Sequence, residues 1–280
     1  MKRQIAALTA LVGALVCAAP GASASEPAHW VAAGTSYTDT LGGGQGLASR
    51  ADGSLLHRGL LDIPLDLRTK GWNHVGDPDI ARGYVFDAYQ GADTATSKMY
   101  AVTTPEGKRY DYVHPLDPGE KVNNSFAAVS PDGQWLVSGE WGDQDRLQVF
   151  PAPLLNPATP RTGGTLAQAG RIGLDKPVRD VQGCDFVSAT RLVCASDDAS
   201  GQLFPQSRPL LQVDLPHPLD GKPVTGRVSS LFALPQRSVC KGTFEAEGVD
   251  YDPAAGTLRA EVVQPGVCAV ATTVYAYRVG

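Results

Sequence analysis

A polar residue stands at the start of each of several strand-like units along this chain. Gln45, Gln182 and Glu247 are each followed directly by a glycine, and His74 and Asn124 open two further units. If the fold brings such side chains together in a concave place, they form a binding site, because pockets carry a few convergent polar groups. The candidate ligand-binding residues are therefore Gln45, His74, Asp77, Asn124, Gln182 and Glu247.

These side chains include carboxylates and amides, which together suit Ca²⁺, a hard cation that prefers oxygen ligands. Asp77 and Glu247 would supply the charge, and the amide oxygens would complete the ligand shell. Asp-x-Asp pairs at residues 77/79, 143/145 and 250/252 could suggest calcium loops, but they lack the third oxygen ligand and the glycine of an EF-hand loop. Such pairs are more typical of aspartates that cap turns.

Carboxylates at the starts of units could also catalyse hydrolysis. In glycosidases one carboxylic acid protonates the leaving group, while a second carboxylate acts as base or nucleophile. Asp77, Asp185 and Glu247 begin three different units, and Trp72 and Trp141 could serve as platforms for a sugar ring. The competing interpretation is structural, because acidic residues are ordinary at the starts of such units and tryptophans also pack between sheets.

Other catalytic signatures do not occur in the sequence. It has no Gly-x-Ser-x-Gly elbow, no His-Glu-x-x-His motif, no phosphate-binding loop and no Cys-x-x-Cys pair. Among the histidines, His74 is the catalytic candidate, because Asp77 and Asp79 lie close enough in sequence to hold its charge or tautomer.

The composition limits the class of protein. The chain has 280 residues, of which 42% are hydrophobic and 19% charged, with a formal net charge of -5. This hydrophobic fraction is too high, and the charge too low, for a disordered chain. The acidic balance and the lack of a Lys/Arg run argue against a nucleic-acid partner.

Short strands must position the candidate residues. Runs rich in Val, Leu, Phe and Tyr alternate with Gly, Pro, Asp and Asn, and no long stretch has apolar residues at helical spacing. Turn signals recur at residues 51–54, 130–133 and 252–256, each between two strand-like runs. This pattern indicates an all-β chain.

The strand pattern repeats. Units begin near residues 45, 74, 124, 182 and 247, and the later ones are long enough for four strands. Repeated four-stranded units predict a single β-propeller over residues 25–280, with five blades and six as the nearest alternative. We expect residues 29–33 to pair with residues 272–278, because this closes the ring and protects strand edges.

Two segments carry a resemblance to known families. Residues 130–136 resemble the blade hairpin of bacterial propellers of the TolB and YncE-like type, and residues 247–252 resemble a blade start in SMP-30/gluconolactonase-like and phytase-like propellers. The whole chain after the leader is similar to a group of uncharacterised secreted bacterial proteins. The resemblance implies that the candidate ligand-binding residues surround one mouth of the central channel, where SMP-30-like enzymes hold a metal. This chain departs from that pattern by offering mostly amides.

The first residues predict export. A basic start is followed by an apolar run over residues 5–19 and by the small residues Ala22, Ser23 and Ala24, which is typical of a secretory signal peptide covering residues 1–24. The run is shorter than the ~20 residues that span a membrane. We therefore expect a secreted, extracellular protein with no transmembrane segment.

Four cysteines follow the predicted signal peptide, and an even number in an exported protein indicates disulfides. Cys184 and Cys194 flank two short strand-like runs around a polar turn, so we expect them to face each other and form a disulfide. The remaining pair is then Cys240 with Cys268.

Two functions remain in competition. The first is a monomeric binding protein that recognises an extracellular carbohydrate, a peptide or a cell-envelope component at the channel mouth. The alternative is a hydrolase of the glycosidase or lactonase type that uses carboxylates or a metal at the same mouth. The first is favoured because the repeated positions carry Gln and Asn more often than acids.

Overall fold

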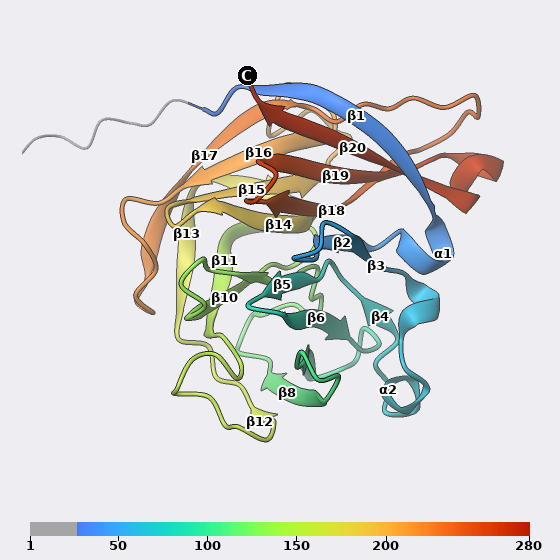
Figure 1. The fold of residues 1–280 in the computed structure, drawn as a ribbon. Helices are drawn as coiled ribbons and strands as arrows, with labels where there is room; N and C mark the ends of the chain where they lie inside the picture. Colours follow the sequence, from blue (N-terminus) through green and yellow to red (C-terminus); the bar gives the residue numbers. More distant parts are fainter. Residues whose placement is uncertain (1–26) are drawn as a thin grey trace, which may run out of the picture.

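The computed structural model describes residues 27–280 (Figure 1). The predicted signal peptide lies outside the described residues. Within them, no helix is long and apolar enough to cross a membrane. Helical structure in this part of the chain is limited to four short segments: α1 (Thr40–Gly43), η1 (Leu60–Asp62), α2 (Leu65–Thr69) and η2 (Gly266–Val270). The prediction of an all-β chain is confirmed.

The strands form a β-propeller (Figure 1). Its largest sheet has eight strands and consists of two antiparallel blades whose outer strands pair in parallel. The strands of the first of these blades are β9 (Ala128–Val129), β10 (Trp135–Ser138), β11 (Asp143–Pro151) and β13 (Gly170–Arg179). Those of the second are β14 (Val181–Ser188), β15 (Arg191–Ser196), β16 (Pro209–Asp214) and β17 (Val224–Ala233).

The remaining strands complete the ring. They form a six-stranded sheet, in which the short β5 pairs only with β6, and a two-stranded sheet that precedes it in the sequence. The first comprises β4 (His74–Val75), β5 (Asp79–Ala81), β6 (Tyr84–Gln90), β7 (Ser97–Thr103), β8 (Arg109–Pro115) and β12 (Gly164–Thr165). The second comprises β2 (Gly46–Ser49) and β3 (Leu55–Arg58). The short spacing of the first sequence unit thus corresponds to a unit of only two strands.

The last blade is completed by the N-terminal strand. Its strands, in order, are β1 (Trp30–Asp39), β20 (Ala271–Val279), β19 (Thr257–Val263) and β18 (Glu245–Asp252). β1 pairs antiparallel with β20 from Trp30 opposite Val279 to Asp39 opposite Ala271. The predicted ring closure by residues 29–33 is confirmed, and Figure 1 shows β1 crossing the top of this blade.

The core lies between neighbouring blades. Phe126, Val137 and Ile172 pack with Phe186 and Val213 across one such boundary, and all five are buried. Full burial of a side chain of this size stabilises the fold by ~1.5–3 kcal/mol. Because the blades bury their faces against each other, the first residues of the inner strands are held close to the propeller axis.

Both predicted disulfides are present. Cys184 lies opposite Cys194 in the β14–β15 hairpin, and the two sulfurs are bonded. The Cys240–Cys268 disulfide ties the loop before β18 to η2. In the chain-entropy picture, each closure contributes about 2–4 kcal/mol by restricting the unfolded chain.

The two-stranded unit is fixed to both neighbours by charged side chains of β3. His57 Nδ1 lies 3.0 Å from Glu261 Oε1 on β19. The next residue, Arg58, places its Nε 2.6 Å from Asp87 Oδ1 on β6. These contacts attach the short unit on each side, where a full blade would use packing between sheets.

Candidate functional site

Asp77 lies at the centre of the ring, surrounded by glycines from three other inner strands. The side chain is fully buried. A Cβ atom added to Gly46, Gly183 or Gly248 would lie 2.4, 2.3 and 2.3 Å, respectively, from one of its carboxylate oxygens. These positions are glycine because the carboxylate fills the space where their side chains would be. The channel is closed at this level.

The Asp77 carboxylate is held by backbone donors of two other blades. Oδ1 accepts a hydrogen bond from the Leu47 N–H at 3.0 Å, and Oδ2 accepts one from the Val249 N–H at 3.0 Å. Burial raises the pKa of Asp77 well above its usual range, although these two bonds oppose the shift. The geometry therefore suits a group that joins inner strands across the axis.

Gln45 and Glu247 lie next to each other beside this group. Gln45 Nε2 lies 3.4 Å from Glu247 Oε1, and Glu247 is 4% exposed. Burial, followed by the charges of Glu245 and Glu261, raises the pKa of Glu247 well above its usual range. Of the candidate ligand-binding residues, Gln45, Asp77 and Glu247 are thus brought to one place.

The other three candidates are placed differently. The Asn124 side-chain amide donates to the carbonyls of Tyr89 and Met99 and accepts a hydrogen bond from Ser138 Oγ, so it is engaged in joining blades. His74 lies in β4, where its Nδ1 is buried without a hydrogen-bond partner and burial lowers its pKa. Gln182 is half-buried on β14.

Two adjoining cavities lie at the opposite ends of the inner strands. Their volumes are about 910 and 340 Å³. Both are lined by Asp79, Ile80, Arg82, Tyr251 and Pro253, and by residues of the hairpin turns that follow the inner strands. We call this place the hairpin-turn mouth. Asp77 and Glu247, and the tryptophans considered as sugar platforms, are not among the residues that line these cavities.

Three aspartates point into the hairpin-turn mouth from equivalent positions. Asp79, Asp185 and Asp250 each lie two residues after the central position of their inner strand, which is occupied by Asp77 or by a glycine. Asp79 lines both cavities, whereas Asp185 and Asp250 line one each. The repeat of the propeller thus carries three carboxyl groups to one mouth.

Each of these aspartates also joins its strand to the next blade. Asp79 Oδ2 accepts from the Val129 N–H at 2.6 Å, and Asp185 Oδ2 accepts from the Tyr251 N–H at 2.6 Å. Asp250 accepts from the Ser49 N–H at 2.7 Å. Asp79 and Asp185 each accept one further backbone hydrogen bond, from the N–H groups of Ile80 and Phe186. Asp250 is also bonded by Ser49 Oγ and by the Arg259 guanidinium. A carboxylate has about four lone-pair positions, so Asp79 and Asp185 keep capacity for a ligand, whereas Asp250 is largely engaged.

The three carboxyl groups resist ionisation together. Burial raises the pKa of Asp79 to about 7, with its backbone hydrogen bonds opposing the shift and the charge of Asp250 adding to it. Burial, followed by the charges of Asp79 and Asp250, raises the pKa of Asp185 well above its usual range. Because the pKa of Asp79 is about 7, this carboxyl group is protonated in part of the molecules near neutral pH, where it donates a hydrogen bond, and ionised in the rest, where it accepts one.

Sequence reasoning named Asp185 but treated Asp79 and Asp250 as turn caps. The missed signal was the position of these aspartates relative to the central residue of each unit. An acidic residue occurs two positions after the central residue in three of the units, at Asp79, Asp185 and Asp250. In a strand, residues two apart point to the same side, so this repeat places three carboxyl groups along one channel.

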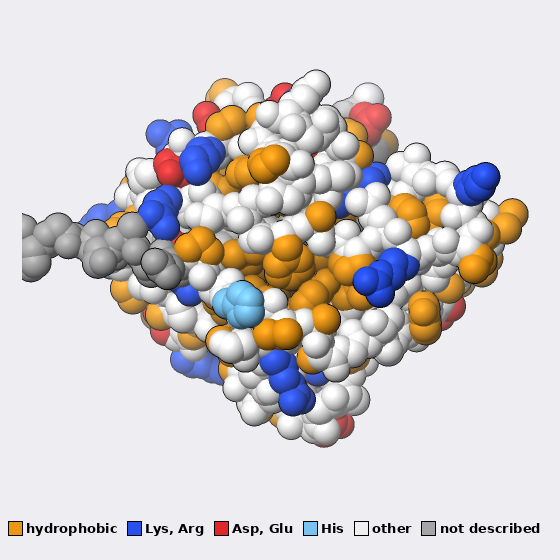
Figure 2. Space-filling model, turned by 90° about the horizontal axis from the view of Figure 1, so that it is seen from above, with side chains coloured by type: hydrophobic (Ala, Val, Ile, Leu, Met, Phe, Trp, Pro, Cys, Tyr) orange, Lys and Arg blue, Asp and Glu red, His pale blue; other side chains and the backbone are white. Residues whose placement is uncertain are grey.

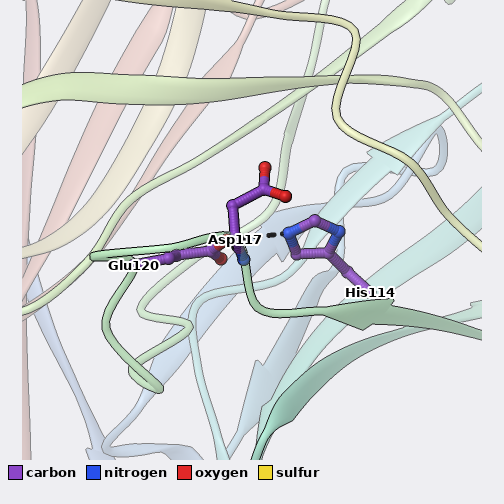
Figure 3. A group of neighbouring side chains, drawn as sticks. All are labelled: His114, Asp117 and Glu120. Carbon is purple, nitrogen blue, oxygen red and sulfur yellow. Dashed lines mark hydrogen bonds and ion pairs between the residues drawn. The ribbon is translucent and has the colours of Figure 1, made fainter.

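A separate cluster of His114, Asp117 and Glu120 offers metal-ligand atoms within 4.8 Å of one another (Figure 3). Both ring nitrogens of His114 are engaged, Nδ1 with the Leu166 carbonyl at 2.9 Å and Nε2 with Glu120 at 2.9 Å. The buried Lys98 ammonium lies 2.9 Å from the other Glu120 oxygen. A divalent cation here would stand beside that ammonium, so the residues fit an ion-pair network rather than a metal site.

The electrostatics of Glu120 agree with this assignment. Burial opposes its charge, but the hydrogen bond from His114 and the Lys98 ammonium hold the pKa of Glu120 well below its usual range. Burial in turn lowers the pKa of Lys98, opposed by Glu120. Each charge of the pair is thus stabilised by the other, and no cation is needed to balance the carboxylate.

Similarity to known proteins is found at the level of structure. No family model matches the chain. No curated protein matches its sequence. The β-propeller domain of Cps50 (Swd1) from Myceliophteria thermophila matches at 13% identity and a TM-score of 0.33, over 64% of this chain and 45% of that one.

Two further solved structures are similar at the same level. The major allergen Mala s 1 of Malassezia sympodialis matches at 12% identity and a TM-score of 0.44, over 76% of this chain and 59% of that one. The periplasmic gluconolactonase PpgL of Pseudomonas aeruginosa matches at 17% identity and a TM-score of 0.37, over 62% of this chain and 46% of that one. The chain spans less than two thirds of each of these proteins.

Proposed function

We propose that this protein is an extracellular binding protein whose hairpin-turn mouth takes up a ligand rich in hydroxyl groups, with carbohydrate as the best-fitting class. The observation that carries the proposal is the set of three carboxyl groups, at Asp79, Asp185 and Asp250, facing cavities of about 910 and 340 Å³. Binding sites of drug-sized ligands have volumes in this range.

The chemistry of the mouth favours hydroxyl groups. Each hydroxyl both donates and accepts a hydrogen bond, and Asp79, whose pKa is raised to about 7, offers both partners near neutral pH. Arg50 and Arg82 add guanidinium donors to the lining of the larger cavity. A peptide or an envelope component with cationic groups is the competing ligand class, because ionised carboxylates attract positive charge.

The compartment fits this proposal. Disulfides persist in oxidising compartments such as the extracellular space, and this chain has two of them. The predicted signal peptide over residues 1–24 would deliver the protein there. Ca²⁺ bound by Asp77, Glu247 and neighbouring amide oxygens stays a prediction.

Arg82 offers a direct test, because it lines both cavities and is exposed in the turn that follows β5. Glycan-array screening followed by calorimetry would identify a sugar ligand of the wild type. We expect Arg82→Ala and Asp185→Asn to weaken binding about tenfold or more, since a hydrogen bond to a charged group contributes ~1.5–3 kcal/mol. Asp145→Asn, at an exposed carboxylate away from the mouth, is the matched control and should bind as the wild type does.

A hydrolase remains the second candidate because of one observation. The carboxyl groups of Asp79 and Asp185 have raised pKa values in one mouth, and a raised pKa is what a general acid requires. Incubation with aryl glycosides and lactones distinguishes the two functions. Turnover that Asp185→Asn abolishes in a folded protein would support the hydrolase, whereas sugar binding without turnover supports the binding protein.

A further inference from the structure

Exposed aliphatic side chains gather at one end of the propeller. Short helices there carry Leu41, Leu60, Leu61 and Leu65, with exposed fractions between 42% and 76%. A neighbouring tip, formed by η2 and the loop over residues 237–241, carries Val239, Val267 and Val270 at 99%, 87% and 74%. We call these seven side chains the apolar end. They include most of the strongly exposed large apolar residues of the described chain.

The segments of the apolar end are connected to one another. A Cβ atom on Gly59, next to η1, would lie 2.1 Å from the Leu41 carbonyl oxygen of α1, so these two segments are in direct contact. α1 also contacts η2. The Cys240–Cys268 disulfide holds the loop with Val239 against η2. The exposed residues therefore lie on segments that contact one another rather than on distant parts of the molecule.

This region lies at the end of the molecule opposite the hairpin-turn mouth. The β2–β3 and β18–β19 hairpins have their turns at the mouth. At the other end of the first hairpin, Gly46 pairs with Arg58, which lies just before η1. At the other end of the second, Glu245 pairs with Val263, shortly before η2. Figure 1 shows α1, α2 and the dark red η2 along the same side of the propeller. In Figure 2 the corresponding right-hand edge carries orange side chains with a Lys or Arg side chain beside them.

The shape and composition of the apolar end favour a hydrocarbon partner. Val239 and Val267 are almost fully exposed, so they project outward and do not line a groove. All seven side chains are Leu or Val, whereas the energetically dominant residues of protein interfaces are enriched in Trp, Tyr and Arg. Projecting aliphatic side chains are suited to the boundary between lipid headgroups and acyl chains.

The charges around the tip complement phosphate groups. Arg237 and Lys241 flank Val239 and are exposed, and within residues 27–280 neither forms an ion pair. Beside the leucines, Asp66 is paired with Lys70 and Arg109, whereas Asp39, just before α1, and Asp62, in η1, are exposed carboxylates, so the cationic part of the apolar end is the tip. The tip is thus locally cationic in a chain whose net charge is -5.

We propose that the apolar end docks this protein onto an anionic phospholipid surface. The leucines and valines enter the boundary of headgroups and acyl chains, while Arg237 and Lys241 contact lipid phosphates. The hairpin-turn mouth then faces away from the lipid, where it is accessible to a ligand. This proposal does not depend on the proposed ligand of the mouth.

Vesicle flotation tests the proposal with the purified mature protein. The wild type should float with vesicles of phosphatidylcholine and phosphatidylglycerol, and less with phosphatidylcholine alone. Val239→Asp and Val267→Asp should each lower the partition coefficient about tenfold or more, because each removes an aliphatic group that enters the lipid and adds a charge. Lys241→Gln should lower it about fivefold on the anionic vesicles only.

Val279→Asp is the matched control, since Val279 is 63% exposed and lies at the other end of β20. It should float as the wild type does. The proposal is overturned if the wild type fails to float on anionic vesicles at low salt, or if Val279→Asp is as impaired as Val239→Asp. A stable dimer in light scattering that Val239→Asp dissociates would assign the apolar end to a second copy instead.

Discussion

Replacement of Gly183 by alanine provides a strict test of the closed propeller axis. The added Cβ would lie 2.3 Å from Asp77 Oδ2 and 2.8 Å from both Gly248 Cα and Val249 N. Two of these neighbours are backbone atoms and the third belongs to a fully buried carboxylate, so none can move cheaply. Overpacking of a core typically costs ~1–3 kcal/mol, and we expect a value near the upper limit here.

The assay is urea unfolding followed by tryptophan fluorescence. Gly173→Ala is the matched control, because its Cβ would meet only the Val224 carbonyl oxygen, at 3.8 Å. Asp77→Ala should itself cost about 2–6 kcal/mol, since it leaves two buried N–H groups unpaired at ~1–3 kcal/mol each. In the double variant Gly183→Ala/Asp77→Ala the clash with the carboxylate is gone. Its loss of unfolding free energy should therefore be smaller than the sum of the losses in the two single variants. Equal stabilities of Gly183→Ala and Gly173→Ala would refute the placement of Asp77 on the axis.

Three other predictions concern titration and cross-linking. Because burial raises the pKa of Asp79 to about 7, its contribution to stability is complete below about pH 3.8 and is lost as the pH rises through 7; Asp79→Asn should flatten this decline in pH-dependent unfolding. Glu120 has a lowered pKa, so its contribution is lost as the pH falls below 4.5, and Glu120→Gln should unfold more easily at neutral pH by ~3–5 kcal/mol but depend less on acid. Removing the Cys240–Cys268 disulfide with two serines should lower the unfolding free energy by ~2–4 kcal/mol; unchanged stability in calorimetry would contradict its role.

The centre of the propeller has a structural explanation for its composition. Asp77 interacts with four of the inner strands: it bonds to Leu47 and Val249, occupies the space beside Gly183, and pairs through its own backbone with Phe126. One buried carboxylate therefore joins the inner strands at the axis, whereas packed apolar side chains join the blades elsewhere in the molecule. A ligand site on the axis is therefore limited to one of its two ends, and the two cavities of the hairpin-turn mouth lie at one of them.

Local sequence determined the elements of this protein. The turn glycines Gly53 and Gly133 have φ angles of 83° and 71°, which L side chains rarely adopt, so the turns could be placed from composition alone. The pairing of Cys184 with Cys194 followed from the hairpin between them, and the strand-like character of residues 29–33 predicted the closing strand β1. Each of these features depends on residues that are neighbours in sequence or on a single regular pairing.

The tertiary structure decided which end of the channel is open and which polar residues face it. Side chains of a strand alternate between its two sides, so a polar residue at a strand start points either to the axis or to the next blade, and the sequence pattern does not distinguish the two. Asn124 bonds to the neighbouring blade, while Asp79 and Asp250 reach the hairpin-turn mouth. Asp77 fills the axis only because glycines from three other blades arrive at the same point. That meeting is set by the packing of distant segments, which is why local residue types could not reveal it.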